Sequence, residues 1–108
     1  MSKHILVVMT NPADGPDEEF NEWYSNTHVQ EVVVIPGFVS AQRFKLSAEQ
    51  AGGTNEYDYL AIYEIEAESA GAALQALKDA RPNLNMSAAL GEKRALWAYD
   101  QITEKVTA

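Results

Sequence analysis

Alternating apolar and polar positions predict four strands in this chain. The first, Lys3 to Thr10, is dense in Ile, Leu and Val, which is typical of a central strand. Three later segments, Phe38 to Leu46, Tyr57 to Glu66 and Lys93 to Thr103, alternate with a period of two. Because the last two segments carry bulky apolar residues on both faces, we expect both sides of the sheet to be covered.

The same alternation assigns side chains to faces within the second strand. It predicts that Phe38 shares a face with Ser40 and Gln42, and that Arg43 lies on the opposite face. The polar segment that follows, Ser47 to Glu56, contains a Gly-Gly pair and predicts an exposed hairpin loop.

Apolar residues spaced three and four apart predict a helix that begins at Asp17 and ends before Pro36. Pro16 suits the first helical position, and three acidic residues follow it at the electropositive helix N-terminus. Pro36 and Gly37 then turn the chain into the second strand.

A second helix is predicted over Ala70 to Arg81, with Ser69 as its N-cap and Pro82 as its stop. The element order is then βαββαβ, an α+β fold of the ferredoxin-like type with a four-stranded antiparallel sheet. Right-handed crossovers place both helices on one face. Residues 1–108 form one domain, and we expect a homodimer in which a second copy covers the other face.

The first helix carries a stripe of an unusual kind. A stripe that only faces a core is uniformly apolar, whereas this one begins with aromatic rings and ends in titratable groups. We interpret it as the wall of a pocket. Its members are Phe20, Trp23, Tyr24, Thr27, His28 and Glu31.

These residues resemble the signature helix of the EthD-like family in the dimeric α+β barrel superfamily. The matching motif is Phe20, the Trp23-Tyr24 pair, His28, Glu31 and the closing Pro-Gly-Phe at 36–38; Gln30 replaces a Pro found in many relatives. The resemblance implies two sheets that close into a barrel with the helices outside. It also implies a pocket between helices and sheet that the histidine faces.

Charge and composition exclude several classes of function. Eight basic and 16 acidic residues give a net charge of −8, so we expect no binding to nucleic acid or to an anionic membrane. The chain has no cysteine, and His28 and Glu31 supply at most two metal ligands from one helix. With no phosphate-cradling loop either, we expect no metal and no cofactor. The first apolar run is too short for a signal peptide, so a cytoplasmic location is expected.

His28 is the candidate catalytic residue. Histidine is the side chain whose ordinary pKa, about 6.5, suits proton transfer near neutrality. Glu31 lies one turn later and is expected to orient or charge the ring, while Tyr24 lies one turn earlier. The alternative is that His28 only caps the C-terminal end of the helix.

Several aromatic residues are candidates for lining a cavity that binds a flat hydrophobic ligand. The alternative for each is plain core packing. Arg43 is a candidate for binding a carboxylate or enolate, although pairing with a surface acid such as Glu64 or Glu66 is favoured, and His4 is expected to be structural or exposed. The aromatic candidates are Trp23, Tyr24, Tyr59, Tyr63 and Trp97, together with Tyr99.

Two functions remain open. In the first, the protein is a small cofactor-independent enzyme of the isomerase, cyclase, lyase or monooxygenase type. The resemblance implies proton transfer on a hydrophobic aromatic, lactone or polyketide-like carbonyl compound. In the second, it is a non-catalytic dimer that binds a hydrophobic small molecule or acts as a scaffold.

Overall fold

The computed structural model describes residues 1–15 and 17–108, so Pro16 and its predicted helix-opening role lie outside the described residues. Four strands and two helical regions follow one another in the predicted order. They are β1 (Ser2–Pro12), α1 (Asp17–Trp23), the π-helical segment η1 (Tyr24–His28), α2 (Val29–Val32), β2 (Phe38–Lys45), β3 (Tyr59–Ala67), α3 (Ala70–Ala80), the 3-10 turn η2 (Arg81–Asn83) and β4 (Leu90–Asp100).

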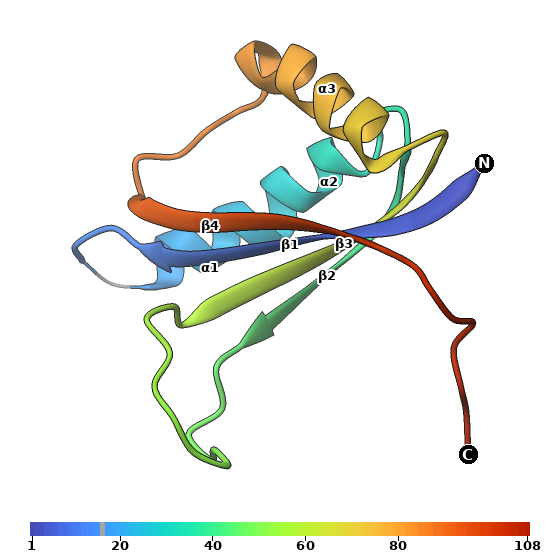
Figure 1. The fold of residues 1–108 in the computed structure, drawn as a ribbon. Coiled ribbons are helices and arrows are strands. Elements are labelled where there is room, and N and C mark those ends of the chain that lie inside the picture. Colours follow the sequence, from blue (N-terminus) through green and yellow to red (C-terminus); the bar gives the residue numbers. More distant parts are fainter. Residues whose placement is uncertain (16) are drawn as a thin grey trace.

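The strands form one antiparallel sheet in the order β2-β3-β1-β4. The helical regions lie together on one side of this sheet (Figure 1). This is the predicted ferredoxin-like arrangement, with β1 and β3 in the centre and β2 and β4 at the edges.

The core lies between the helices and one face of the sheet. Alternate residues of the central strands are buried there, among them Leu6 of β1 and Ile65 of β3. Phe20, Val32 and Ala73 pack against them from the helices. Burial follows the predicted alternation in β3, so the sequence pattern there sets which face meets the helices, and β1 alternates in the same way.

One face assignment is wrong. The register of β2 against β3 shifts between Phe38 and Ser40, so that Phe38 pairs with Ile65 on the helix side and is buried. Such a bulge adds one residue and breaks the two-residue period. Phe38 and Arg43 therefore share the helix side, and Ser40 points to the opposite face.

Strand and helix ends also differ from the prediction. β3 begins at Tyr59 rather than Tyr57, and the first helical region ends at Val32, ahead of Pro36. β1 continues to Pro12, which the pattern assigned to a loop, because β4 begins early at Leu90 and pairs with it across a register shift.

The backbone geometry at two positions requires glycine. Gly37 has a φ of +98°, which confirms that it turns the chain out of the first helical region. Gly91 lies so close to β1 that an added Cβ would be 2.6 Å from the carbonyl oxygen of Asn11. Gly91 thus permits the early pairing of β4 with β1.

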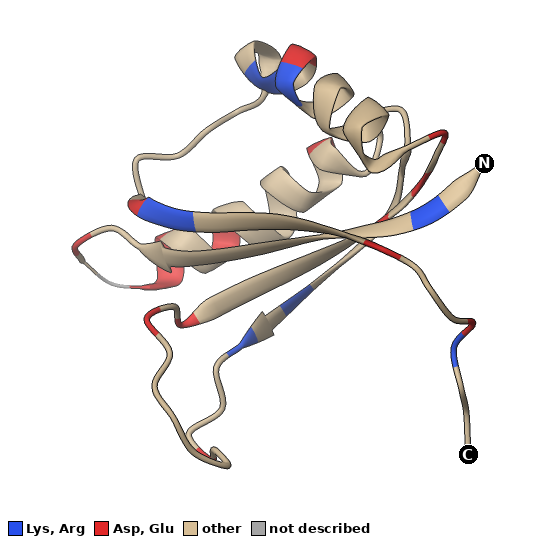
Figure 2. Ribbon diagram, in the orientation of Figure 1, with Lys and Arg blue, Asp and Glu red and all other residues tan. Residues whose placement is uncertain are grey.

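The second face of the sheet is apolar and exposed. Trp97 and Tyr99 of β4 are 56% and 55% exposed, and Val39 and Phe44 of β2 are also exposed. Figure 2 shows Lys and Arg as separate short patches rather than a continuous stripe. Among the described residues, no helix is both long and apolar enough to cross a membrane.

Candidate functional site

The first helical region is not a regular α-helix, because its middle turn, Tyr24–His28, is π-helical. The backbone N–H of Val29 donates to the carbonyl oxygen of Tyr24, five residues earlier, so residues five apart lie one above the other. The indole of Trp23 accordingly stacks on the ring of His28, with centroids 4.8 Å apart and planes at 26°. Single π turns of this kind occur frequently at functional sites.

His28 is enclosed by two aromatic rings and faces a cavity. Besides the stacked indole, the ring of Tyr24 meets it edge-on with centroids 5.0 Å apart. The Nδ1 atom of His28 is buried and has no hydrogen-bond partner among the described residues. Asn85, which lies in the segment before β4, holds Trp23 in place, because the indole N–H of Trp23 donates to the carbonyl oxygen of Asn85 at 2.6 Å.

Burial lowers the pKa of His28 to about 4, since a charged ring would lose its hydration there. Glu31 opposes this shift, while Arg81, Arg94 and Arg43 add to it. The ring is therefore neutral at pH 7. The sequence led us to expect a group that titrates near neutrality, whereas burial moves the pKa of His28 well below that range.

Glu31 does not orient His28 directly. Its carboxylate accepts hydrogen bonds from the backbone N–H and the side-chain amide of Asn85, at 3.0 and 2.9 Å. Glu31 and Trp23 thus both hold the segment that follows η2, and Glu31 acts on His28 only through its charge.

Two tyrosines complete the polar part of the site. Burial raises the pKa of Tyr24 and of Tyr63, so both remain protonated at pH 7. The hydroxyls of Tyr24 and Tyr63 lie close enough for a contact between them to act on both pKa values, but that contact has poor hydrogen-bond geometry and no other described residue pairs with the buried Tyr63 hydroxyl. A bound molecule that supplies a better acceptor can therefore replace Tyr24 as its partner.

The cavity beside these groups is small and mostly apolar, with a volume of about 50 Å³. Its apolar wall includes leucines of β1, β4 and α3, and Leu84 and Met86 line it from the irregular segment before β4. The cavity lies at the β4 edge of the sheet, where Leu96 is 43% exposed. The polar residues lining it are Thr10, Tyr24, His28, Tyr63, Arg81 and Arg94.

Tyr59 and Arg43, both predicted to bind substrate, use their hydrogen bonds within the fold. The hydroxyl of Tyr59 donates to Asp17 at 2.8 Å and accepts from Asn21 at 3.1 Å. The guanidinium of Arg43 donates to Ser25 at 2.8 Å and to Asn21 at 3.1 Å. Both residues therefore anchor α1 and η1 to the sheet.

Arg43 also lies 4.4 Å above the ring centre of Tyr24, a distance suited to a cation–π contact. The favoured pairing with Glu64 or Glu66 is wrong, because the bulge in β2 places Arg43 on the helix side. Glu64 instead accepts a hydrogen bond from Ser40 on the other face.

Trp97 lies away from His28. It pairs with Val7 on the exposed face of the sheet, as Tyr99 does with Ile5, so neither ring lines the cavity. The aromatic candidates are thus divided between two faces and do not form one binding surface.

Arg81 and Arg94 line the cavity and were not among the sequence candidates. Arg94 and Leu96 lie on the helix side of β4, and strand alternation alone places these two residues on one face. The sequence did not indicate which face of β4 meets the cavity, so Arg94 was not among the predicted site residues.

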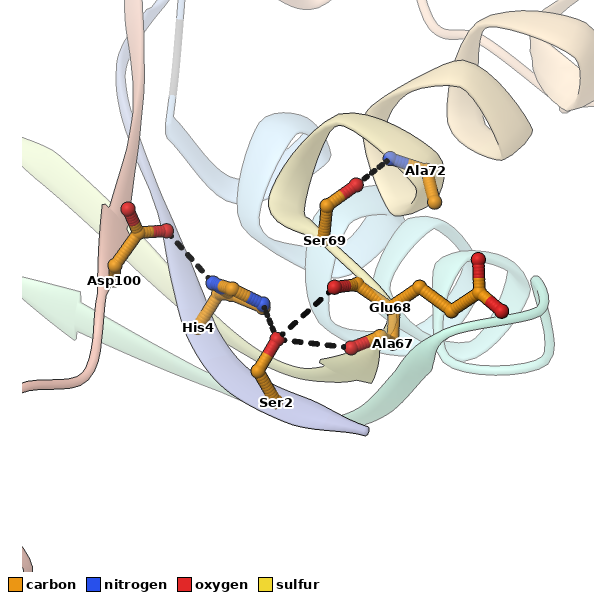
Figure 3. Close-up of polar contacts among 7 residues, drawn as sticks. All are labelled: Ser2, His4, Ala67, Glu68, Ser69, Ala72 and Asp100. Carbon is orange, nitrogen blue, oxygen red and sulfur yellow. Dashed lines mark hydrogen bonds and ion pairs between the residues drawn. The ribbon is translucent and has the colours of Figure 1, made fainter.

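A second polar cluster ties three strands together at the other end of the sheet (Figure 3). The Nδ1 atom of His4 contacts the carboxylate of Asp100 at 2.7 Å, and its Nε2 contacts the hydroxyl of Ser2 at 2.7 Å. His4 is buried, and the carbonyl oxygens of Ala67 and Glu68 lie 3.1 and 3.2 Å from the same hydroxyl.

The atoms of this cluster follow the order of a serine hydrolase triad. Such a triad needs N–H donors around a developing oxyanion, whereas the serine here has two carbonyl oxygens as neighbours. We therefore interpret the cluster as structural, which agrees with the expectation for His4. Figure 3 also shows Ser69 accepting from the N–H of Ala72 at 3.1 Å, the predicted N-cap of α3.

No group of three or more His, Asp or Glu side chains is placed to hold a metal ion within residues 1–15 and 17–108. The cavity itself contains a single imidazole and no carboxylate. Its chemistry is that of proton transfer and hydrogen bonding in an apolar setting.

No protein-family model and no curated protein matches the chain. Solved structures do match it. An ethyl tert-butyl ether D (EthD) family protein from Bacillus halodurans has a TM-score of 0.60 at 19% identity, covering 94% of this chain and 100% of that one. MhuD from Mycobacterium tuberculosis, a haem degrader with two haems bound in its active site, has a TM-score of 0.66 at 14% identity, covering 95% and 99%.

A dimeric ferredoxin-like protein of unknown function from Thermobifida fusca has a TM-score of 0.57 at 13% identity, covering 93% of this chain and 92% of that one. At these identities the likeness concerns the fold. The predicted ferredoxin-like fold is thereby confirmed, and it is the fold that this chain shares with the EthD family protein and with the dimeric ferredoxin-like protein.

Proposed function

We propose that the protein is a small cofactor-independent enzyme that moves a proton on a hydrophobic carbonyl compound at the His28 cavity. The observation that carries this proposal is the buried Nδ1 atom of His28, which has no hydrogen-bond partner among the described residues and lines the same cavity as the hydroxyl of Tyr63. Leaving a buried polar group unpaired costs about 1–3 kcal/mol, so a bound molecule that pairs His28 Nδ1 recovers that free energy.

The protonation states assign the roles. Neutral His28 accepts a proton from the carbon beside the substrate carbonyl, as its C–H bond breaks and the electron pair moves to the carbonyl oxygen. The Tyr63 hydroxyl, kept protonated by burial, donates a hydrogen bond to that oxygen. Tyr24 supports the same oxygen, and the proton then returns from His28 to a different atom in an isomerase, cyclase or lyase.

The residues that line the cavity indicate the class of substrate. Leucines and Met86 favour an aromatic, lactone or polyketide-like body over a sugar or nucleotide. Pockets that enclose drug-sized ligands measure roughly 300–1,000 Å³. The present volume of about 50 Å³ encloses neither a haem nor a polyketide-like body without rearrangement. We infer that substrate enters by displacing the segment from Leu84 to Leu90, which has little regular structure.

A non-catalytic binding protein is the second candidate. His28 and Tyr63 would then bind a ligand oxygen without any proton transfer, and the cavity offers no second base beside His28. The two functions differ in whether hydrogen at the carbon beside a carbonyl exchanges with solvent.

Exchange of the α-hydrogens of 2-indanone in heavy water, followed by NMR, tests the proposal. Wild-type protein should accelerate the exchange, and His28→Gln should lose about 10²–10⁴-fold of that acceleration. Tyr63→Phe should also slow it, whereas Tyr57→Phe, whose ring lies outside the cavity, should not. Binding of 2-indanone without accelerated exchange would support the binding protein instead.

We also propose that a second copy of the chain covers the exposed face of the sheet. Trp97, Tyr99 and Phe44 form an apolar surface there. Exposed apolar patches of this kind commonly mark an interface between proteins. The dimeric ferredoxin-like protein of the same fold supports this choice of partner.

A further inference from the structure

Two arginines from different elements meet at the His28 cavity. Arg81 is the first residue of η2, directly after α3, and Arg94 lies in β4 on the helix side of the sheet. Both line the cavity, and both are exposed to solvent. They therefore lie between the buried polar atoms and the surrounding water.

Neither arginine has an acidic partner. The ion pairs found among the described residues join His4 to Asp100 and Lys93 to Glu56, and neither includes Arg81 or Arg94. The cavity wall contains no carboxylate, although the chain carries 16 acidic residues and a net charge of −8. The opening of this cavity is therefore positively charged, whereas the protein as a whole is negatively charged.

Resting on the function proposed above, we propose that the ligand carries an anionic group, a carboxylate, on its apolar body, and that Arg94 and Arg81 bind it at the opening of the cavity. The planar guanidinium fork matches a carboxylate with two parallel hydrogen bonds. The carbonyl end of the same ligand then reaches Tyr63 and His28. The substrate class is thus narrowed to hydrophobic oxo acids and lactone acids.

The same two arginines lower the pKa of His28, together with burial, which is the main cause. A bound carboxylate offsets their positive field at the ring, so it raises the pKa of His28 from about 4 towards neutrality. Anion binding and the ability of His28 to hold a proton are therefore coupled. An ordinary hydrophobic pocket would show no such coupling.

Binding of benzoate and of benzamide, which have nearly the same shape and differ in charge, tests the proposal. NMR titration follows the ring signals of His28 and Tyr63 with each probe. Wild-type protein should prefer benzoate, and Arg94→Met should weaken benzoate binding about 10- to 100-fold while leaving benzamide binding unchanged. Arg81→Met should have the same selective effect.

Lys78→Met is the matched control, because Lys78 is an exposed cation near the end of α3 that does not line the cavity. It should leave benzoate binding unchanged. In wild-type protein, benzoate should also raise the pKa of His28, and at the same benzoate concentration the rise should be smaller in Arg94→Met because less of that variant is occupied.

Equal affinity for the two probes, or an equal loss in Lys78→Met and Arg94→Met, would overturn the proposal. Failure of the enzymatic function is separable from it. If benzoate binds selectively through Arg94 but no carbonyl probe exchanges hydrogen with solvent, the protein binds anions and is not an enzyme of the proposed kind. If 2-indanone exchanges hydrogen but substitution of either arginine does not change benzoate binding, the protein is an enzyme for neutral substrates.

Discussion

Acidification is expected to destabilise the protein through His28. Its pKa falls from an ordinary value of 6.5 to about 4 in the folded state, mainly because the ring is buried. Between these two values the unfolded chain binds a proton that the folded protein does not. The stability associated with this neutral ring is therefore fully present above pH 6.5, and it is lost as the pH falls towards 4.

The size of the effect follows from the same two values. At about 1.36 kcal/mol per pKa unit, the fall from 6.5 to about 4 corresponds to at most about 3 kcal/mol. His28 is only partly buried, so solvent screening reduces this figure, and we expect about 1–2 kcal/mol. A variant without a titratable group at position 28 isolates the contribution of His28.

Urea unfolding of wild type and His28→Gln at pH 7.0 and 4.5, at one protein concentration, isolates it. Glutamine keeps the hydrogen-bonding capacity and does not titrate. Wild type should lose about 1–2 kcal/mol more than the variant on acidification. An NMR titration of the His28 ring should show a midpoint well below 6. Parallel pH dependences of the two proteins, together with a midpoint near 6.5, would refute the reasoning.

Three further predictions concern stability and assembly. Gly37→Ala should cost about 1 kcal/mol or more in a thermal melt, because φ is +98° and the new Cβ would lie 3.2 Å from Cβ of Ala73; an unchanged melting temperature would contradict this. Tyr63→Phe should reduce activity while changing the free energy of unfolding by no more than about 1 kcal/mol, because the buried hydroxyl has only the poorly aligned contact with the Tyr24 hydroxyl among the described residues; a larger loss of stability would show that the hydroxyl holds the fold together. Light scattering at micromolar concentration should report a dimer for wild type and a monomer for Trp97→Asp, and a wild-type monomer would exclude the proposed interface.

The fold was largely predictable from periodicity. One dense apolar run, three segments with a period of two and two with a period near 3.6 lead to a βαββαβ order, and the handedness of crossovers then fixes the helix side. The error at Phe38 has a local cause. A bulge between Phe38 and Ser40 depends on how β2 meets β3 across the sheet, and nothing in the sequence of β2 itself signals it.

The candidate site was predictable only in part. His28, Tyr24 and Tyr63 lie together as the stripe and the strand alternation suggested. Arg94 and Arg81 come from elements far apart in the chain, so only the assembled sheet brings them to one cavity. The spacing of Tyr24 and His28 fits an α-turn as well as a π-turn, so the stacking of Trp23 on His28 could not be foreseen.

Departures from what folding alone favours are concentrated at this cavity. A π-turn interrupts the helix, and among the described residues His28 Nδ1 lacks a hydrogen-bond partner while Arg81 and Arg94 form no ion pair. His4 shows the contrast, because both of its ring nitrogens are hydrogen-bonded. Several departures of this kind at one cavity support the proposal that the cavity serves a ligand. The polar groups there also say what that ligand must supply: an acceptor for Tyr63, a hydrogen-bonding group for His28 and an anion for the arginines.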